Sequence, residues 1–166
     1  MKLFISILLI TFLPAFSSCT NGNHEGVAIY LIENDIHPQQ LSTLDHLELA
    51  DTPFLTEKEI ISYQKETHEI DLTADGIKKL QKMDIPVTGT AFALCVNHEP
   101  IYTGAFWKDY SSVSYNGVVI NTTLVSQEIP TIRIQLGYPN ASFFRGDDPR
   151  SDPRILEELQ KAGKLR

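Results

Sequence analysis

The sequence predicts an α+β fold, with a mainly antiparallel sheet of about five strands, one helix packed on a face of that sheet, and a second helix at the C-terminus. Three observations predict it. Short runs rich in β-branched and aromatic residues are separated by turn residues, as strands are. Two segments carry apolar residues at helical spacing behind an N-capping residue. Helices and strands do not alternate regularly, which argues against a parallel α/β sheet.

The first half of the chain predicts a strand, a short helix, and then a strand followed by a helix. The run "GVAIYLIE" (26–33) is the first expected strand. Thr56 and Glu59 have the spacing of a capping box, which predicts a brief helix from Glu57. The alternation in "THEIDLT", with Glu69 and Asp71 outward and Ile70 and Leu72 inward, predicts a half-buried strand. The threonine that ends this strand caps a helix expected over residues 74–83.

The second half predicts several strands and a last helix. "TGTAFALCVN" (88–97) and "IYTGAFW" (101–107) are expected to pair as an antiparallel hairpin. The first of them has large apolar residues on one face and small ones on the other, and we expect a helix to pack closely on the small face. "NGVVIN" and "PTIRIQLG" supply two further strands. Asp152 as cap and Pro153 as first helical residue start the C-terminal helix.

The N-terminal twenty residues have the layout of an export signal. Lys2 precedes an apolar run that reaches about Phe16, which is short of the roughly 20 residues that span a bilayer. Small residues and Cys19 follow, and "FSSC" resembles the lipobox of bacterial lipoproteins, in which the cysteine is acylated on its thiol and becomes the new N-terminus. The resemblance implies a signal peptide over residues 1–18 and a palmitate-type lipid on Cys19. Ordinary secretion and a cytosolic start are the alternatives.

The remaining residues predict a tether and one domain. Residues 19–26 hold the lipidated cysteine and a polar tether, and residues 27–166 have the usual size of a single domain. Seven tether residues extend to at most about 24 Å, so the domain would work close to the membrane. The lipobox predicts the cell envelope. Thr20, in place of an aspartate after the cysteine, favours the outer membrane in a Gram-negative host.

The charge balance disfavours one class of partner. The chain has 14 Lys and Arg against 21 Asp and Glu, a net charge of −7, and loss of residues 1–18 would remove only Lys2 from this count. The densest basic group, Lys78, Lys79 and Lys82, is typical of a solvated helix face. Nucleic acid is therefore not an expected partner, and an anionic membrane surface is expected to repel the domain rather than bind it. The expected partners are the membrane, through the lipid, and an envelope protein, peptide or glycan.

Residues 53–106 resemble a known family. "PFLTEKEIISYQ", "HEIDLTADGIKKLQKM" and "TGTAFALCVNHEPIYTGAF" follow one another in an order similar to the head subdomain of the periplasmic region of SecD, an export-motor membrane protein. The resemblance implies an α+β arrangement for these residues. It carries no catalytic motif and does not continue after residue 106, so no SecD activity is expected of this chain.

The sequence has no complete catalytic motif, so an enzyme is the less favoured interpretation. None of His24, His68 and His98 is followed by a second histidine four residues later, as a zinc-hydrolase helix requires. Cys95 lies between apolar residues of an expected strand, where a buried, unreactive thiol is expected. No metal or other cofactor is expected. The alternative is a small envelope hydrolase that uses a polar loop containing Asp35, His37, Asp45 and His46.

One aromatic stretch is the candidate binding surface. In "EPIYTGAFWKDYSS" (99–112) the residues up to Phe106 alternate like a central strand that is covered on both sides. Beyond Phe106 the chain is expected to leave the strand, and we expect a binding surface there, made by Trp107, Tyr110, Ser111, Ser112 and Tyr115. Glycan stacking is one form that such binding takes, and it requires the Trp107 ring to be exposed.

Overall fold

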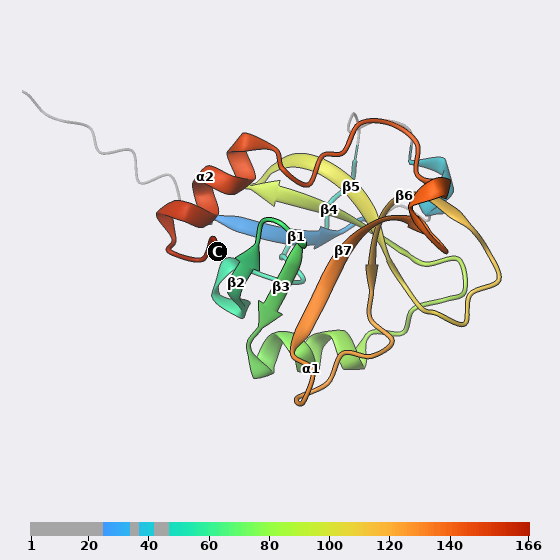
Figure 1. Cartoon of the computed structure of the whole chain (residues 1–166), viewed down its shortest axis with the longest axis horizontal. Helices are drawn as coiled ribbons and strands as arrows, with labels where there is room; N and C mark the ends of the chain where they lie inside the picture. The colour runs from blue at the N-terminus through green and yellow to red at the C-terminus, as the bar shows by residue number, and fades with distance from the viewer. Residues whose placement is uncertain (1–24, 34–36, 42–46) are drawn as a thin grey trace, which may run out of the picture.

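The computed structural model describes residues 25–33, 37–41 and 47–166. Within these ranges seven strands form one sheet in the order β1-β4-β5-β6-β7-β3-β2 (Figure 1). The strands are β1 (Val27–Leu31), β2 (Ile60–Gln64), β3 (Glu69–Leu72), β4 (Thr90–Val96), β5 (Glu99–Trp107), β6 (Tyr115–Asn121) and β7 (Thr131–Tyr138). The helices are α1 (Ala74–Lys82) and α2 (Pro153–Lys161), with the 3-10 turns η1 (Pro38–Gln40), η2 (Glu57–Glu59) and η3 (Ala141–Phe143).

The predicted α+β class and the mainly antiparallel sheet are confirmed. Every neighbouring pair of strands is antiparallel except β5 and β6. Both predicted helices are present with their predicted caps. Thr73 Oγ1 accepts the Gly76 N–H at 3.3 Å at the start of α1, and an Asp152 carboxylate oxygen accepts the Arg154 N–H at 2.9 Å at the start of α2. No helix in the described part of the chain is long and apolar enough to cross a bilayer.

The sheet has seven strands and not about five, and one of them replaces most of an expected helix. The capping box forms, with the Thr56 N–H donating to Glu59 Oε2 at 2.7 Å. It starts only a single 3-10 turn, and β2 begins at Ile60 directly after it. Ile60 and Tyr63 are buried, and pairing with β3 satisfies backbone groups that a longer helix would have satisfied internally. Burial of this β-branched run outweighs the local helix signal.

The connection between the parallel strands β5 and β6 is short. Residues 108–114 bring the chain back along the sheet, because β6 runs parallel to β5 with Gly104 opposite Val118 and Trp107 opposite Asn121. Val113, within this connection, packs on Ala105, Trp107 and Val119. The connection therefore covers one face of the sheet.

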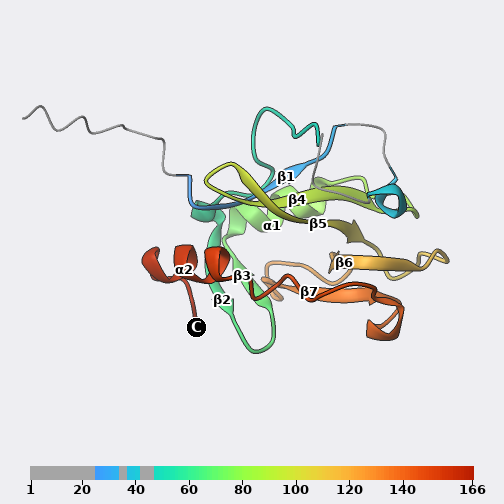
Figure 2. The ribbon, with the colours of Figure 1, turned by 90° about the horizontal axis from the view of Figure 1, so that it is seen from above.

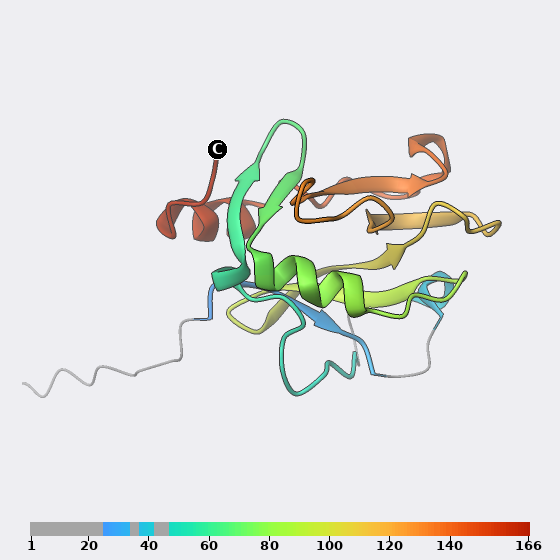
Figure 3. The same ribbon diagram turned by 90° about the horizontal axis from the view of Figure 1, so that it is seen from below.

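The sheet curls around one core. All seven strands contribute buried side chains to the largest core cluster, and α1 adds Ile77 and Leu80. α2 contacts β1 and β4 at one end of the strand order. At the other end, Leu165, just after α2, forms a parallel bridge with Tyr63 of β2. In Figures 2 and 3, α1 lies near the middle of the molecule and α2 lies at one end.

We call the side of the sheet that faces this core the inner face and the opposite side the outer face. On β4 the outer face carries the expected small residues Ala91, Ala93 and Cys95, beside Ala28 and Tyr30 of β1. The helix expected to pack there is absent from the described ranges. Leu41, and Leu47 and Leu49 of the described segment 47–50, pack against that face instead. This segment also pairs with the edge of β1, where the Ala50 N–H donates to the Leu31 carbonyl at 2.9 Å. An extended segment can pair with the free backbone N–H and C=O groups at the edge of a sheet, whereas a helix cannot.

The hairpin between β4 and β5 holds the first described residues. Asn97, at the tip of that hairpin, accepts the backbone N–H groups of both Glu25 and Gly26 on its Oδ1, each at 3.1 Å. The folded part of the chain thus includes two residues that the sequence predicted to belong to the tether.

Candidate binding groove

The five predicted binding residues fall into two groups. Trp107, Ser111 and Tyr115 are buried, with 0 %, 8 % and 4 % of their surface exposed. Tyr110 is 67 % exposed, and Ser112 is exposed as well. The prediction that Trp107 and Tyr115 belong to a binding surface is wrong, because neither ring can stack on a glycan. Tyr110 and Ser112 remain available to a ligand.

Trp107 is enclosed by the chain that was expected to leave it exposed. Its ring stacks on Tyr115, with centroids 5.4 Å apart and planes 11° apart, and Tyr138 lies at 5.6 Å. Gly89 approaches so closely that a Cβ on it would lie 2.4 Å from the indole ring. Ser111 is also buried, and its hydroxyl donates a hydrogen bond to the carbonyl of Val87, in the loop before β4. The connection 108–114 is therefore a cover.

A groove opens where the outer face lacks such a cover. It has a volume of about 420 Å³ and is formed by β3, β6 and β7 together with parts of the connection 108–114 and the loop 122–130. We call it the polar groove. Its polar residues are Glu69, Asp109, Asn121, Thr131, Arg133 and Gln135, and its apolar wall includes Leu124 and Ile129.

An ion pair joins β7 to β3 in the polar groove. Arg133 of β7 donates to Glu69 Oε1 of β3 through both Nε, at 3.0 Å, and Nη2. The Thr67 hydroxyl donates to Glu69 Oε2 at 3.0 Å. These hydrogen bonds, first that from Arg133, stabilise the carboxylate and lower the pKa of Glu69. The Arg133 side chain is 54 % exposed, so its guanidinium remains accessible to a ligand.

The rest of the floor combines fixed and free polar groups. The Asn121 amide donates to an Asp109 carboxylate oxygen, and the Tyr138 hydroxyl donates to the Asp109 carbonyl at 2.8 Å. These bonds hold one end of the polar groove. Gln135 makes no side-chain hydrogen bond with any described residue. Its amide therefore offers a donor and an acceptor.

The loop 122–130 supplies an apolar wall. Leu124 and Ile129 are 71 % and 52 % exposed, which is unusual for such side chains. The loop is held in place, since Ser126 Oγ accepts the Ile129 N–H at 3.1 Å and Gln127 donates to the Ala74 carbonyl at 3.4 Å. A polar floor beside an apolar wall suits a ligand that has both kinds of surface.

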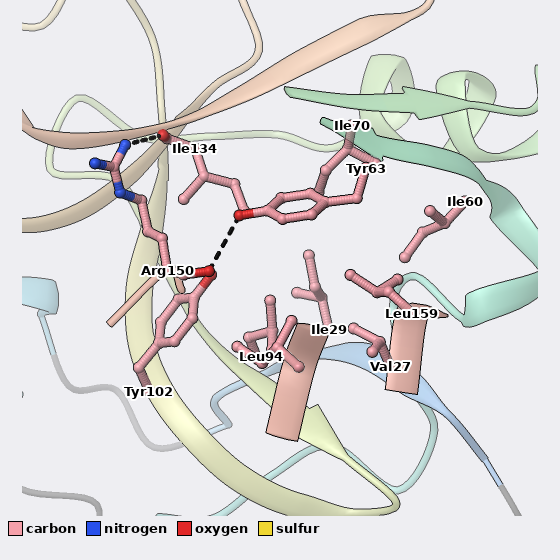
Figure 4. A pocket seen from close by; sticks show the side chains of 11 residues that line it. Val27, Ile29, Ile60, Tyr63, Ile70, Leu94, Tyr102, Ile134, Arg150 and Leu159 are labelled. Atoms are coloured by element: carbon pink, nitrogen blue, oxygen red, sulfur yellow. Dashed lines mark hydrogen bonds between the residues drawn. The ribbon is translucent and has the colours of Figure 1, made fainter. Parts of the chain in front are cut away.

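A second pocket lies inside the core and is too small for a ligand. Figure 4 shows it, with Tyr63, Tyr102 and Arg150 among its lining side chains. Tyr63 donates to the Arg150 carbonyl at 3.1 Å, while the buried Tyr102 hydroxyl has no partner among the described residues. Burial raises the pKa of Tyr63 to about 12. The free space is about 10 Å³, which is room for roughly one water molecule.

The residues of the hydrolase alternative mostly lie outside the described ranges. Asp35, Asp45 and His46 are outside them, as is Cys19, while His37 is exposed just before η1. Cys95 is fully buried, as predicted, and burial raises the pKa of its thiol to about 12. Within the described ranges no group of three or more His, Cys, Asp or Glu is placed to hold a metal ion.

Comparison of the chain with protein-family models, with curated protein sequences and with solved structures finds no match.

Sequence reasoning missed most of the polar groove. The outward position of Glu69 was predicted, and Arg133 and Gln135 alternate with isoleucines in "TIRIQ" in the same way. That alternation indicates an open sheet face. It does not indicate that β3 and β7 are neighbours, because Glu69 and Arg133 are 64 residues apart.

Proposed function

We propose that this chain is a bacterial envelope lipoprotein, anchored by a lipid on Cys19, whose domain is a non-enzymatic binding module. The observation that carries the binding part is the polar groove, an uncovered area of the outer face with free hydrogen-bonding groups beside two exposed apolar side chains. The anchor rests on "FSSC" and the apolar run before it. An outer-membrane location in a Gram-negative host is part of the same proposal.

A peptide segment of an envelope protein fits the polar groove better than a glycan does. Apolar peptide side chains would pack on Leu124 and Ile129, and peptide amides would hydrogen-bond to Gln135 and Arg133. A glycan platform needs exposed aromatic rings, and burial of Trp107 and Tyr115 leaves Tyr110 as the exposed aromatic residue next to Asp109 of the groove. The ligand class that we propose is therefore a peptide with both polar and apolar side chains.

The anchor is tested by metabolic labelling with a palmitate analogue. The wild-type chain is expected to take up the label and to sediment with membranes, whereas Cys19→Ala is expected to lose the label and the sedimentation. Label that persists in Cys19→Ala would contradict the lipoprotein assignment.

The polar groove is tested by photo-crosslinking in cells. A photoreactive amino acid at Gln135 is expected to give a discrete adduct, which mass spectrometry identifies as an envelope protein. The matched control places the same group at Gln160, an exposed residue of α2. Arg133→Glu in the Gln135 variant is expected to weaken the adduct. Equal adduct yields at Gln135 and Gln160, or an adduct yield that Arg133→Glu does not change, would contradict the assignment of the polar groove as the binding site.

A further inference from the structure

A second groove, on the α1 side of the molecule, is apolar with a basic rim. It has a volume of about 600 Å³. Its apolar residues include Leu31, Pro53, Phe54 and Met83, and its charged residues are Lys79 and Lys82. We call it the α1 groove. Figure 3 looks onto this side, where α1, β1 and the chain that leads into η2 lie together.

The α1 groove lies near the point where the described chain begins. Pro53 lines both the α1 groove and the depression that contains Glu25. Glu25 is fixed there, because its N–H and that of Gly26 are bound by Asn97. Six peptide steps separate Cys19 from Glu25, and they extend to at most about 22 Å. A lipid on Cys19 would therefore hold Glu25 within about that distance of the bilayer, and the α1 groove adjoins the depression of Glu25 at Pro53.

The charge of the α1 groove differs in sign from that of the whole chain. No carboxylate of the described residues lines the groove, whereas the whole chain has a net charge of −7. Lys79 is paired with Glu59 and donates to the Phe54 carbonyl at 3.0 Å. Lys82 is exposed and has no ion-pair partner among the described residues. A negative membrane surface therefore attracts this side of the domain while it repels the acidic remainder.

We propose that the α1 groove is the face with which the anchored domain rests on an anionic membrane. Leu31, Phe54 and Met83 would meet the boundary between headgroups and acyl chains, and Lys82 would lie among phosphate groups. The short tether makes this contact local, so weak attraction is enough to orient the domain. The inference rests on the proposed anchor at Cys19, and it gives the domain a fixed orientation on the membrane surface.

The test is a depth measurement on the full lipidated chain in vesicles of phosphatidylethanolamine and phosphatidylglycerol. Thr52, an exposed residue of the α1 groove, is replaced by cysteine and labelled with an environment-sensitive dye. Cys95 is fully buried, so it does not compete for the dye. The matched control is Ser142→Cys on η3, another exposed position, which is far from α1 in Figure 3. Quenchers attached to the lipid acyl chains report how close each dye lies to the bilayer.

The dye at Thr52 is expected to be quenched several-fold more than the dye at Ser142. Lys82→Glu in the Thr52→Cys chain, or replacement of phosphatidylglycerol by phosphatidylcholine, is expected to reduce that difference. Lys82 is exposed, so its replacement tests the charge without disturbing the core. Equal quenching at the two positions, or a difference unchanged by Lys82→Glu, would overturn the inference.

Two other occupants of the α1 groove give different signals. If the lipid on Cys19 folds back into the groove, the dye shifts to the blue without quenching by the surrounding lipids. If a second copy of the chain covers the groove, energy transfer between labelled copies rises with protein density. Either result overturns the membrane contact. Flotation of the vesicles tests the anchor separately, because a chain that does not float with them lacks the lipid, whatever its dye reports.

Discussion

The outer face of the sheet has a covered region and an open region, and the two differ in side-chain chemistry. On β5 and β6 the outer face carries Ala105, Trp107 and Val119, and the connection 108–114 covers them. On β3 and β7 it carries charged and amide side chains, and the polar groove leaves them open. The difference shows that the apolar side chains, which gain free energy from burial, decide where loops cover the sheet.

Polar side chains on the open region satisfy one another instead of being covered. The Asp71 carboxylate accepts hydrogen bonds from the hydroxyl groups of Ser62, at 2.8 Å, and Thr131, at 2.6 Å. It thereby links β2, β3 and β7. Arg133 and Glu69 form a second such link. Cross-strand pairs of this kind stabilise a sheet without excluding water, so this region can remain available to a ligand.

The largest effect on stability is expected from removal of the Trp107 ring, which the connection 108–114 encloses. Trp107→Ala is expected to lower the free energy of unfolding by about 3–5 kcal/mol, because it leaves a large cavity under the connection 108–114. Urea unfolding followed by circular dichroism measures it. Tyr110→Ala, in the same connection but 67 % exposed, is the control and should change stability by less than about 0.5 kcal/mol. Similar losses in both variants would mean that the connection does not act as a cover.

The next largest effect is expected at Gly104, in the centre of β5. A Cβ there would lie 2.5 Å from Phe92 and 2.7 Å from the Val118 carbonyl. Gly104→Ala is therefore expected to cost about 1–3 kcal/mol of unfolding free energy through overpacking of the inner face. Gly146→Ala does not serve as a control, since Gly146 has positive φ. Phe92→Leu in the Gly104→Ala chain should recover part of the loss, and failure to do so would show that the strain lies in the backbone contact.

A smaller effect is expected where the two regions meet. The Tyr138 hydroxyl donates to the carbonyls of Asp109 at 2.8 Å and Ser111 at 3.1 Å, both within the connection 108–114. Tyr138→Phe keeps the ring beside Trp107 and removes these bonds, so it is expected to cost about 0.5–1.5 kcal/mol. Faster hydrogen exchange at the amides of the connection, with little change elsewhere, would locate the effect. Uniformly faster exchange would instead indicate loss of the whole fold.

The smallest effect on stability is expected in the open region. Glu69→Gln removes an exposed ion pair and should cost less than about 1 kcal/mol near neutral pH. Arg133 lowers the pKa of Glu69 in the folded state, so the pair stabilises the fold above the ordinary glutamate pKa and stops doing so as the pH falls through the lowered value. Unfolding measured from neutral to acid pH should therefore show a shallower loss in Glu69→Gln than in the wild type. Parallel profiles would mean that the pair does not couple to folding.

Several elements of the fold were predictable because their signals are local. The caps at Thr73 and Asp152, and the alternation in each strand, involve residues within a few positions of one another. β2 was not predicted because the capping box at Thr56 indicates a helix from nearby residues alone. The strand depends instead on pairing with β3, further along the chain. The parallel pairing of β5 and β6 was missed because a seven-residue connection normally predicts a hairpin.

The candidate site was only partly predictable. The sequence indicated residues 107–115 as a surface, and Tyr110 and Ser112 are exposed there, whereas Trp107 and Tyr115 are not. An aromatic residue at the end of a strand has the same sequence signature whether or not a loop folds over it. The resemblance of residues 53–106 to the SecD head subdomain, and the lipid on Cys19, stay predictions.

By itself the sequence determined the α+β class, the two capped helices, the burial of Cys95 and which side chains of each strand share a face. All of these depend on residue type and on spacing along the chain. Only the tertiary structure decided which strands are neighbours and which face each loop covers. Those outcomes placed Trp107 under the connection 108–114 and joined Glu69 to Arg133 across the polar groove. They depend on contacts between residues far apart in the sequence, and a single sequence carries no local record of such contacts.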